Sequence, residues 1–189
     1  MLKRNLCYGS NPPRKGPSMS DLTKSAIDVI VDAINLDNPN LNLVSADITL
    51  GNPVDISGSD PQHNTQLTIT ATAGRAYRGD TDIKYNRVAL ADIAATGSAE
   101  FISDESLVQI SDLVTLFNTR FSTNLVAGVD YTDGALPAAP EPGQSTTVTL
   151  TALLSSVVYL GAVELTLSTD QIDLDAAIEN KDLSGLTIE

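Results

Sequence analysis

The chain has 189 residues, enough for one or two domains with real hydrophobic cores. Its hydrophobic fraction is 42% and its aromatic fraction only 4%, so aliphatic side chains must supply most of the core volume. The net charge of −13 disfavours nucleic-acid binding by the globular part, since an acidic surface repels phosphates, and no apolar run is long enough to cross a bilayer.

The charge is unevenly distributed. Residues 1–20 contain four basic residues and no acid, residues 21–87 contain five basic and nine acidic residues, and residues 88–189 contain two basic and fifteen acidic residues. The part of the chain through residue 87 is therefore neutral (nine basic, nine acidic), whereas the rest carries all of the net −13. Such polarity favours ordered, directional assembly over a symmetric clamp.

The first 19 residues are basic and rich in Pro, Gly, Ser and Asn. A segment of this composition has little apolar surface to bury by itself. We therefore expect an extended arm that docks on a neighbouring protein. No signal peptide is expected, because no apolar stretch follows the first basic residues. The arm residues expected to make the interaction are Lys3, Arg4, Tyr8, Arg14 and Lys15.

Residues 20–90 predict a first α+β unit. Its helix is expected to begin at Ser20 or Asp21 and to end at Asn38, with one buried face. The apolar stripe of that face is Leu22, Ile27, Ile30, Val31 and Ile34. A turn at Gly79 joins the last two of the following elements. These are, in order, a strand, a loop, a half-buried strand and its partner: residues 43–50, 51–64, 65–72 and 81–90.

Residues 91–102, rich in Ala, predict a linker to a second unit over 103–168. Its helix is expected to have Ser103 as N-cap and Asp104 and Glu105 in the first turn, where the helix dipole favours acids. Its apolar stripe is Leu107, Ile110, Leu113, Val114 and Phe117. The elements expected after it are a strand, a loop and two strands of a hairpin: residues 124–132, 134–144, 146–153 and 161–167. Residues 169–189 predict an acidic tail with a short helix near 173–180.

The two units resemble one another in sequence. Residues 66–71 align with 147–152 at an offset of 81, residues 42–44 with 124–126 at 82, and the two helical stripes at 83. Gly79 falls on Gly161 and Asp47 on Asp130. This indicates an α+β fold made of two tandem repeats of a helix followed by three strands. The repeats could form one pseudo-twofold domain or two small ones. Close packing is favoured, since about 65 residues are marginal alone.

No catalytic or metal-binding pattern is present in the sequence. Cys7 and His63 lie far apart, and no P-loop, Gly-x-Gly-x-x-Gly or Gly-x-Ser-x-Gly motif occurs. One Cys and one His disfavour a zinc site. The acidic clusters lack the spacing of an EF-hand loop and are interpreted as solvated faces. They are Asp80 with Asp82, and Asp170, Asp173 and Asp175. We therefore expect no catalytic residue, cofactor or metal.

Arg78-Gly79-Asp80 spells a cell-adhesion tripeptide, but it aligns with Leu160-Gly161-Ala162, where only the glycine recurs. A backbone turn requires glycine and not the flanking charges. Gly79 and Gly161 are therefore interpreted as turn and scaffold residues.

Two stretches are similar to virion structural proteins of large tailed bacteriophages. The first runs from Gly58-Ser59-Asp60-Pro61 through Asn64-Thr65-Gln66 and Gly79 to Tyr85-Asn86-Arg87, with Ile69 as a departure from the pattern. The second is Phe117–Leu125 followed by Asp130, with Ser122 where the pattern has glycine. The resemblance implies a non-catalytic structural subunit located in the virion and assembled in the host cytoplasm.

The expected partners are other virion proteins and copies of the chain itself, reached through the arm, with strand addition at Thr-rich sheet edges as a second route. Tail, baseplate or neck is favoured slightly over head decoration. A receptor- or glycan-binding module is the alternative, which would require exposed aromatic side chains. A cell-envelope hydrolase is the third hypothesis, which would require a pocket with paired carboxylates.

Overall fold

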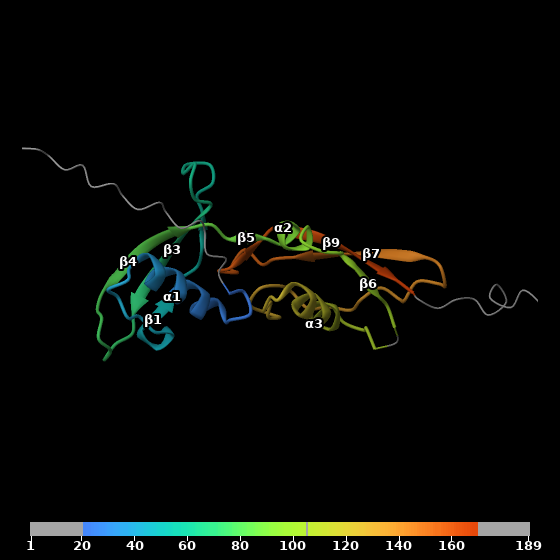
Figure 1. The fold of residues 1–189 in the computed structure, drawn as a ribbon, viewed down its shortest axis with the longest axis horizontal. Coiled ribbons are helices and arrows are strands. Elements are labelled where there is room, and N and C mark those ends of the chain that lie inside the picture. Colours follow the sequence, from blue (N-terminus) through green and yellow to red (C-terminus); the bar gives the residue numbers. More distant parts are fainter. Residues whose placement is uncertain (1–20, 105, 170–189) are drawn as a thin grey trace, which may run out of the picture.

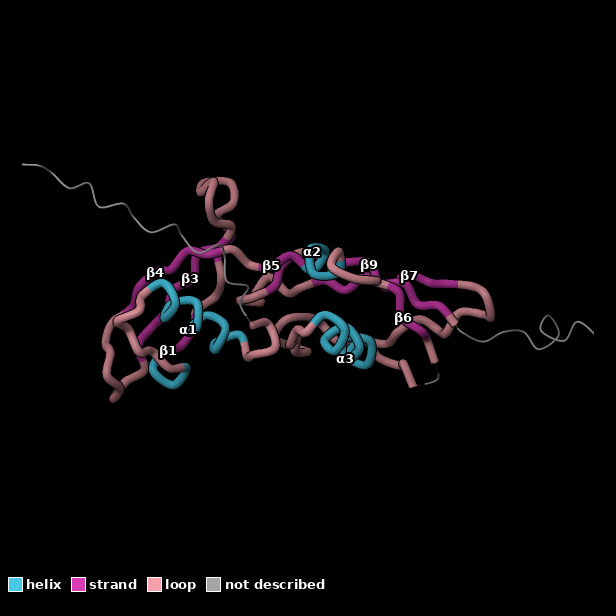
Figure 2. The backbone as a smooth tube through the Cα atoms, in the orientation of Figure 1, coloured by secondary structure: helices cyan, strands magenta, loops and turns pink. Residues whose placement is uncertain are grey.

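The computed structural model describes residues 21–104 and 106–169, and it has a mixed α+β fold of elongated outline (Figure 1). Two helix-and-sheet layers follow one another along the long axis, with α1 and α3 on the same side of the sheets (Figure 2). The expected arm, residues 1–19, and residues 170–189 of the expected tail lie outside the described residues.

The first half contains a four-stranded antiparallel sheet. Its central strand β3 (Thr65–Ala71) pairs with β4 (Asp80–Tyr85) on one side. On the other side β3 pairs with two short strands, β1 (Ile48–Leu50) and β2 (Val54–Asp55). The alternating pattern of residues 65–72 predicted β3 because every second side chain of this strand faces the core. Leu67, for example, is completely buried.

Helix α1 (Ala26–Asp37) packs on this sheet. Its N-cap is Ser25, whose hydroxyl accepts from the Asp28 backbone N–H. The helix therefore begins later than the expected Ser20 or Asp21. Asp21 instead accepts from both the backbone N–H and the hydroxyl of Thr23 and forms a separate turn. Acidic side chains that bond nearby backbone groups compete with helix formation in this way.

The second half is built around β9 (Ala162–Ser168). It pairs antiparallel with β7 (Ser145–Thr151) and parallel with β6 (Glu100–Ile102). Helix α3 (Ile110–Phe121) packs on this sheet. Its N-cap is Gln109 and not the expected Ser103. Asp104 accepts from the backbone N–H and hydroxyl of Ser106, which is the same local turn as that at Asp21.

The interval expected to be a linker, residues 91–102, is instead part of the fold. It contains strand β6 and all of helix α2 (Leu90–Ala94) except its first residue, and Ile93 and Phe101 are buried in the core. The strand expected over 81–90 ends at Tyr85. It is followed by β5 (Val88–Ala89), which pairs in parallel with β8 (Tyr159–Leu160). Alanine composition indicated a linker, but Ala94 is buried in the core beside Ile93.

Two other expected strands differ in the structure. Within 43–50, residues Ser45–Asp47 form a 3₁₀ turn, η1, and only 48–50 are extended. Residues 124–132 form no strand, and their only ladder contacts are isolated bridges, among them Tyr131 with Ala152. In each case a buried Asp side chain accepts backbone N–H groups and bends the chain: Asp47 accepts from Val44, and Asp130 from Val126.

The structure has two hydrophobic clusters, one centred on each sheet, and the two halves share them in part: Val29 of α1 belongs to the cluster of the second half, and Val157 packs against that of the first. Hydrogen bonds also connect the two halves. Arg87 donates to the backbone carbonyls of Leu154 and Ser156, and its Nε to the hydroxyl of buried Thr65. The Tyr85 hydroxyl donates to the Val157 carbonyl at 2.6 Å. These contacts join the end of the first sheet to the loop before β8.

Candidate interaction surface

Two predicted scaffold glycines lie where the backbone requires them. Gly79 precedes β4 with a φ of +87°, and Gly161 precedes β9 with a φ of +76°. The Gly79 carbonyl accepts from Ala71, the last residue of β3, and the Gly161 carbonyl accepts from Ala152, which directly follows β7. A positive φ is costly for residues with a Cβ. Gly79 of the Arg-Gly-Asp tripeptide thus has a structural explanation.

Most of the other candidate residues from the sequence belong to the arm. Lys3, Arg4, Tyr8, Arg14 and Lys15 lie outside the described residues, as does Cys7. His63 lies beside Asp60, at 3.4 Å, in the loop before β3 that projects from the sheet (Figure 1). Across the described ranges, no three His, Cys, Asp or Glu side chains converge as they would around a metal ion. No helix in those ranges is long and apolar enough to span a membrane.

Asp60 fixes the projecting loop to the sheet. Its carboxylate accepts from the backbone N–H groups of Gln62 and His63 and from Lys84 Nζ, the last at 3.1 Å. The pKa of the Asp60 carboxyl therefore lies well below its usual range, first because Gln62 donates to it and next because Lys84 does. Asp82 likewise accepts from Gln66 and Thr68 of the neighbouring strand. Both carboxylates therefore make hydrogen bonds within the first sheet and its loop.

The strand β4 has a free edge. One side pairs with β3 along its whole length, and the other side pairs with no strand in the described part of the chain. Unpaired strand edges present rows of N–H and C=O groups that can accept another strand. The edge is therefore a candidate for recognition of an extended segment.

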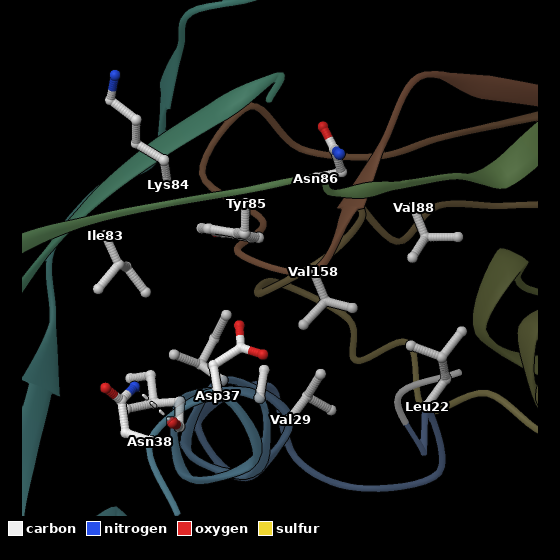
Figure 3. Close-up of a pocket in the computed structure, with 13 residues that line it drawn as sticks. Leu22, Val29, Asp37, Asn38, Ile83, Lys84, Tyr85, Asn86, Val88 and Val158 are labelled. Atoms are coloured by element: carbon white, nitrogen blue, oxygen red, sulfur yellow. Dashed lines mark hydrogen bonds between the residues drawn. The ribbon is translucent and has the colours of Figure 1, made fainter. Parts of the chain in front are cut away.

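A groove of about 260 Å³ runs between this edge and helix α1. In Figure 3, Ile83 and Tyr85 point from β4 toward the helix, whereas Lys84 and Asn86 point away from it. Most of the lining is apolar, and Asp37 lies at the helix end. The complete lining is Leu22, Val29, Ile30, Ala33, Ile34, Asp37, Asn38, Ile83, Lys84, Tyr85, Asn86, Val88 and Val158.

Tyr85 forms a firm wall of the groove. Burial raises the pKa of its hydroxyl to about 12, and the hydroxyl is fixed by the Val157 carbonyl. Leu22, which lies at the other end, belongs to the short described segment that precedes α1. A second hollow of about 360 Å³ continues past Ile34 and Ile83 toward the turn at Gly79.

The corresponding edge in the second half is covered. Strand β6 lies along β9, and Phe101 of β6 is only 1% exposed. Arg120, in the last turn of α3, lies 4.0 Å from the centre of the Phe101 ring and donates to the carbonyls of Ser98 and Glu100. In the second half, β6 with its Phe101 side chain therefore fills the space beside β9. The equivalent space beside β4 in the first half is open.

Further hydrogen bonds recur in the two halves. Asn35 of α1 bonds both backbone groups of Leu43, and Asn118 of α3 bonds both backbone groups of Leu125. The Asp47 carbonyl accepts from Thr72, just after the end of β3, and the Asp130 carbonyl from Leu153, just after the end of β7. Sequence reasoning missed the paired asparagines and the groove. The signal for the asparagines was their offset of 83, which equals that of the helical stripes (118 − 35 = 83).

A protein-family model, described as a family of unknown function (DUF7941), matches residues 19–188. Neither a curated protein nor a solved structure matches the chain significantly. Because the family match spans most of the sequence, the chain belongs to the DUF7941 family.

Proposed function

We propose that the chain is a non-catalytic structural subunit of a tailed-phage virion, which assembles through its N-terminal arm with copies of itself and other particle proteins. The observation that carries this proposal is the free β4 edge, bordered by an apolar groove that Leu22 also lines. A groove beside a strand edge suits recognition of an extended chain segment. The phage resemblance of residues 58–87 and 117–130 supplies the biological setting.

The finer architecture is also proposed: two tandem copies of one unit, each with a helix and three strands. The recurring contacts of Asn35 and Asn118, the turns at Asp21 and Asp104, and the glycines before β4 and β9 support it. The copies have specialised. The second has its own strand beside the helix and carries the acidic charge, whereas the first has an open groove and the basic arm.

Placement in the tail, baseplate or neck is the favoured location, because a subunit with two unlike ends suits an adaptor between different neighbours. The chain would then be retained in the particle by repeated arm contacts. Attraction between the basic arm of one subunit and the acidic body of its neighbour would raise the association rate. It predicts weaker association at high salt.

The first test is mass spectrometry of purified particles of the phage that carries this sequence, which should contain the chain in many copies per particle. A variant without residues 1–19 should remain folded and soluble but should not be incorporated. The matched control replaces the four arm cations with Gln and keeps the length; it should be incorporated less than the natural chain at low salt and should lose the dependence on salt. Absence of the chain from particles would refute the proposal, and full incorporation of the truncated variant would refute the role of the arm.

A further inference from the structure

We propose that the α1–β4 groove accepts residues 3–8 of a second copy of the chain as an added strand, parallel to β4. The inference rests on the proposed arm-mediated assembly and names the surface and the partner that the assembly uses. Its physical basis is the way in which the second half fills the equivalent space with β6.

The register follows from the strand pairs. Leu67 of β3 is paired with Ile83, and Val148 of β7 is paired with Leu165. With Leu67 equivalent to Val148, β9 corresponds to β4 at an offset of 82 (165 − 83 = 82). The β6 residues pair with residues 166–168 of β9, whose counterparts are residues 84–86. Residues 84–86, at the end of β4 and just after it, line the groove, so the position of β6 and the position of the groove coincide.

The backbone of β4 has the matching free groups. The Ala71 N–H donates to the Gly79 carbonyl, so that pair and every second pair beyond it are the hydrogen-bonded ones. Lys84 pairs with Gln66, between two such hydrogen-bonded pairs, so the backbone N–H and C=O of Lys84 point away from β3. In the second half the equivalent residue, Thr166, donates to the Ala99 carbonyl of the β6 side at 3.0 Å. An added strand would be bonded in the same way.

The chain segment that directly precedes α1 is a poor candidate for filling the groove. The turns at Asp21 and Asp104 align at an offset of 83 (104 − 21 = 83), which places Ser18 at the position of Phe101. Pro17 has no N–H to donate. Small side chains would leave most of the 260 Å³ empty, and an unfilled apolar hollow forfeits contacts.

The start of the arm has the required pattern. Arg4, Leu6 and Tyr8 alternate with polar or small residues, so one face of an extended segment would present all three. With Leu6 at the position of Phe101, Arg4 takes the position of Ala99 and faces the C-terminal end of α1. That helix has no basic residue in its last turn, and Asp37 lies where α3 has Arg120. A cation is favoured there by the carboxylate and by the helix dipole.

A second copy is the better source of the added strand because of residues 9–20, the connector between that strand and the fold. If Tyr8 lay at the mouth of its own groove, the chain up to Asp21 would have to close a loop that contains Pro12, Pro13 and Pro17. Prolines stiffen a linker and favour extension. At full extension the same connector spans about 40 Å, enough to reach a neighbouring subunit.

Cys7 provides a direct test, because it is the only cysteine of the chain. In the proposed register it lies opposite Asn86, on the outward face of β4. The full-length variant Asn86→Cys should form an intermolecular disulfide with Cys7 under mild oxidation, visible as dimers and higher oligomers on a non-reducing gel. The matched control is Glu164→Cys, an exposed position on β9. The yield should exceed the control by about tenfold, reflecting the effective concentration of a docked arm.

In the Asn86→Cys variant, an intrachain disulfide between Cys7 and the introduced thiol would overturn the second-copy donor, and a yield no higher than that of the control would overturn the site. A charge swap covers the case in which Asn86→Cys perturbs the fold. Asp37→Lys should reduce self-association measured by sedimentation, and adding Arg4→Asp should restore it; no rescue would also overturn the proposal. If the chain is present in particles but these tests fail, the arm-groove pairing alone is wrong, whereas absence from particles refutes the proposed function.

Discussion

Removal of the Phe101 side chain should identify β6 as an integral strand of the second sheet. Phe101 is 1% exposed, so Phe101→Ala should lower the free energy of unfolding by about 3–5 kcal/mol, the usual cost of such a cavity. Loss of the Arg120 cation over the ring should add about 0.5–1 kcal/mol to that cost.

The matched control is Ile102→Ala on the same strand, because that side chain is 51% exposed. It should cost about 0.5 kcal/mol or less. Urea unfolding followed by circular dichroism measures both free energies, with the slope checked for a common two-state transition. Equal effects of the two substitutions would refute the assignment of β6 to the core and with it the template for the groove beside β4.

Three further predictions concern the paired features of the two halves and the projecting loop. Asn35→Ala and Asn118→Ala should each lower the free energy of unfolding by about 1–3 kcal/mol, because each leaves two backbone groups unpaired. Gly79→Ala and Gly161→Ala should each cost about 1 kcal/mol in thermal or urea unfolding, since both residues have positive φ. Asp60→Asn should flatten the pH dependence of the urea midpoint below about pH 4.

The sign for Asp60 follows from its depressed pKa. The carboxylate stabilises the fold fully above its unfolded pKa of about 4, and that stabilisation is lost as the pH falls toward the folded value. A steeper pH dependence in Asp60→Asn would contradict this. Gly58→Ala is the control for the glycines, because Gly58 has no positive φ and a Cβ there meets nothing within 4 Å. An Asn118→Ala effect far smaller than that of Asn35→Ala would argue against equivalent roles.

The hairpin strands could be predicted from the sequence, because alternation of apolar and polar side chains directly reflects one buried face. Residues 65–72 and 146–153 correspond closely to β3 and β7. The helix starts could not, since Ser20, Ser103 and the acids after them fit an N-cap equally well. Only the hydrogen bonds of Asp21 and Asp104 distinguish a separate turn from a first helical turn.

The groove could not be predicted either, because it depends on a missing neighbour. Whether an edge strand is covered depends on long-range pairing, and the segment that contains Phe101 had the composition of a linker. The pairing of β6 with β9 joins residues more than sixty positions apart, beyond what local patterns indicate. Charge and composition alone indicate that Lys3, Arg4 and Tyr8 belong to an interacting arm. The alternation of Arg4, Leu6 and Tyr8 points to an added strand only once an open strand edge is known.

Amide hydrogen exchange of the full chain at increasing concentration tests the central claim most directly. The Lys84 N–H lies at the free edge, so it should exchange fast in dilute solution and slow down as copies associate, whereas Thr166, already bonded to Ala99, should be protected throughout. A variant without residues 1–19 should show no slowing at Lys84. Fast exchange of Lys84 in fully associated wild-type chains would contradict arm docking in the α1–β4 groove.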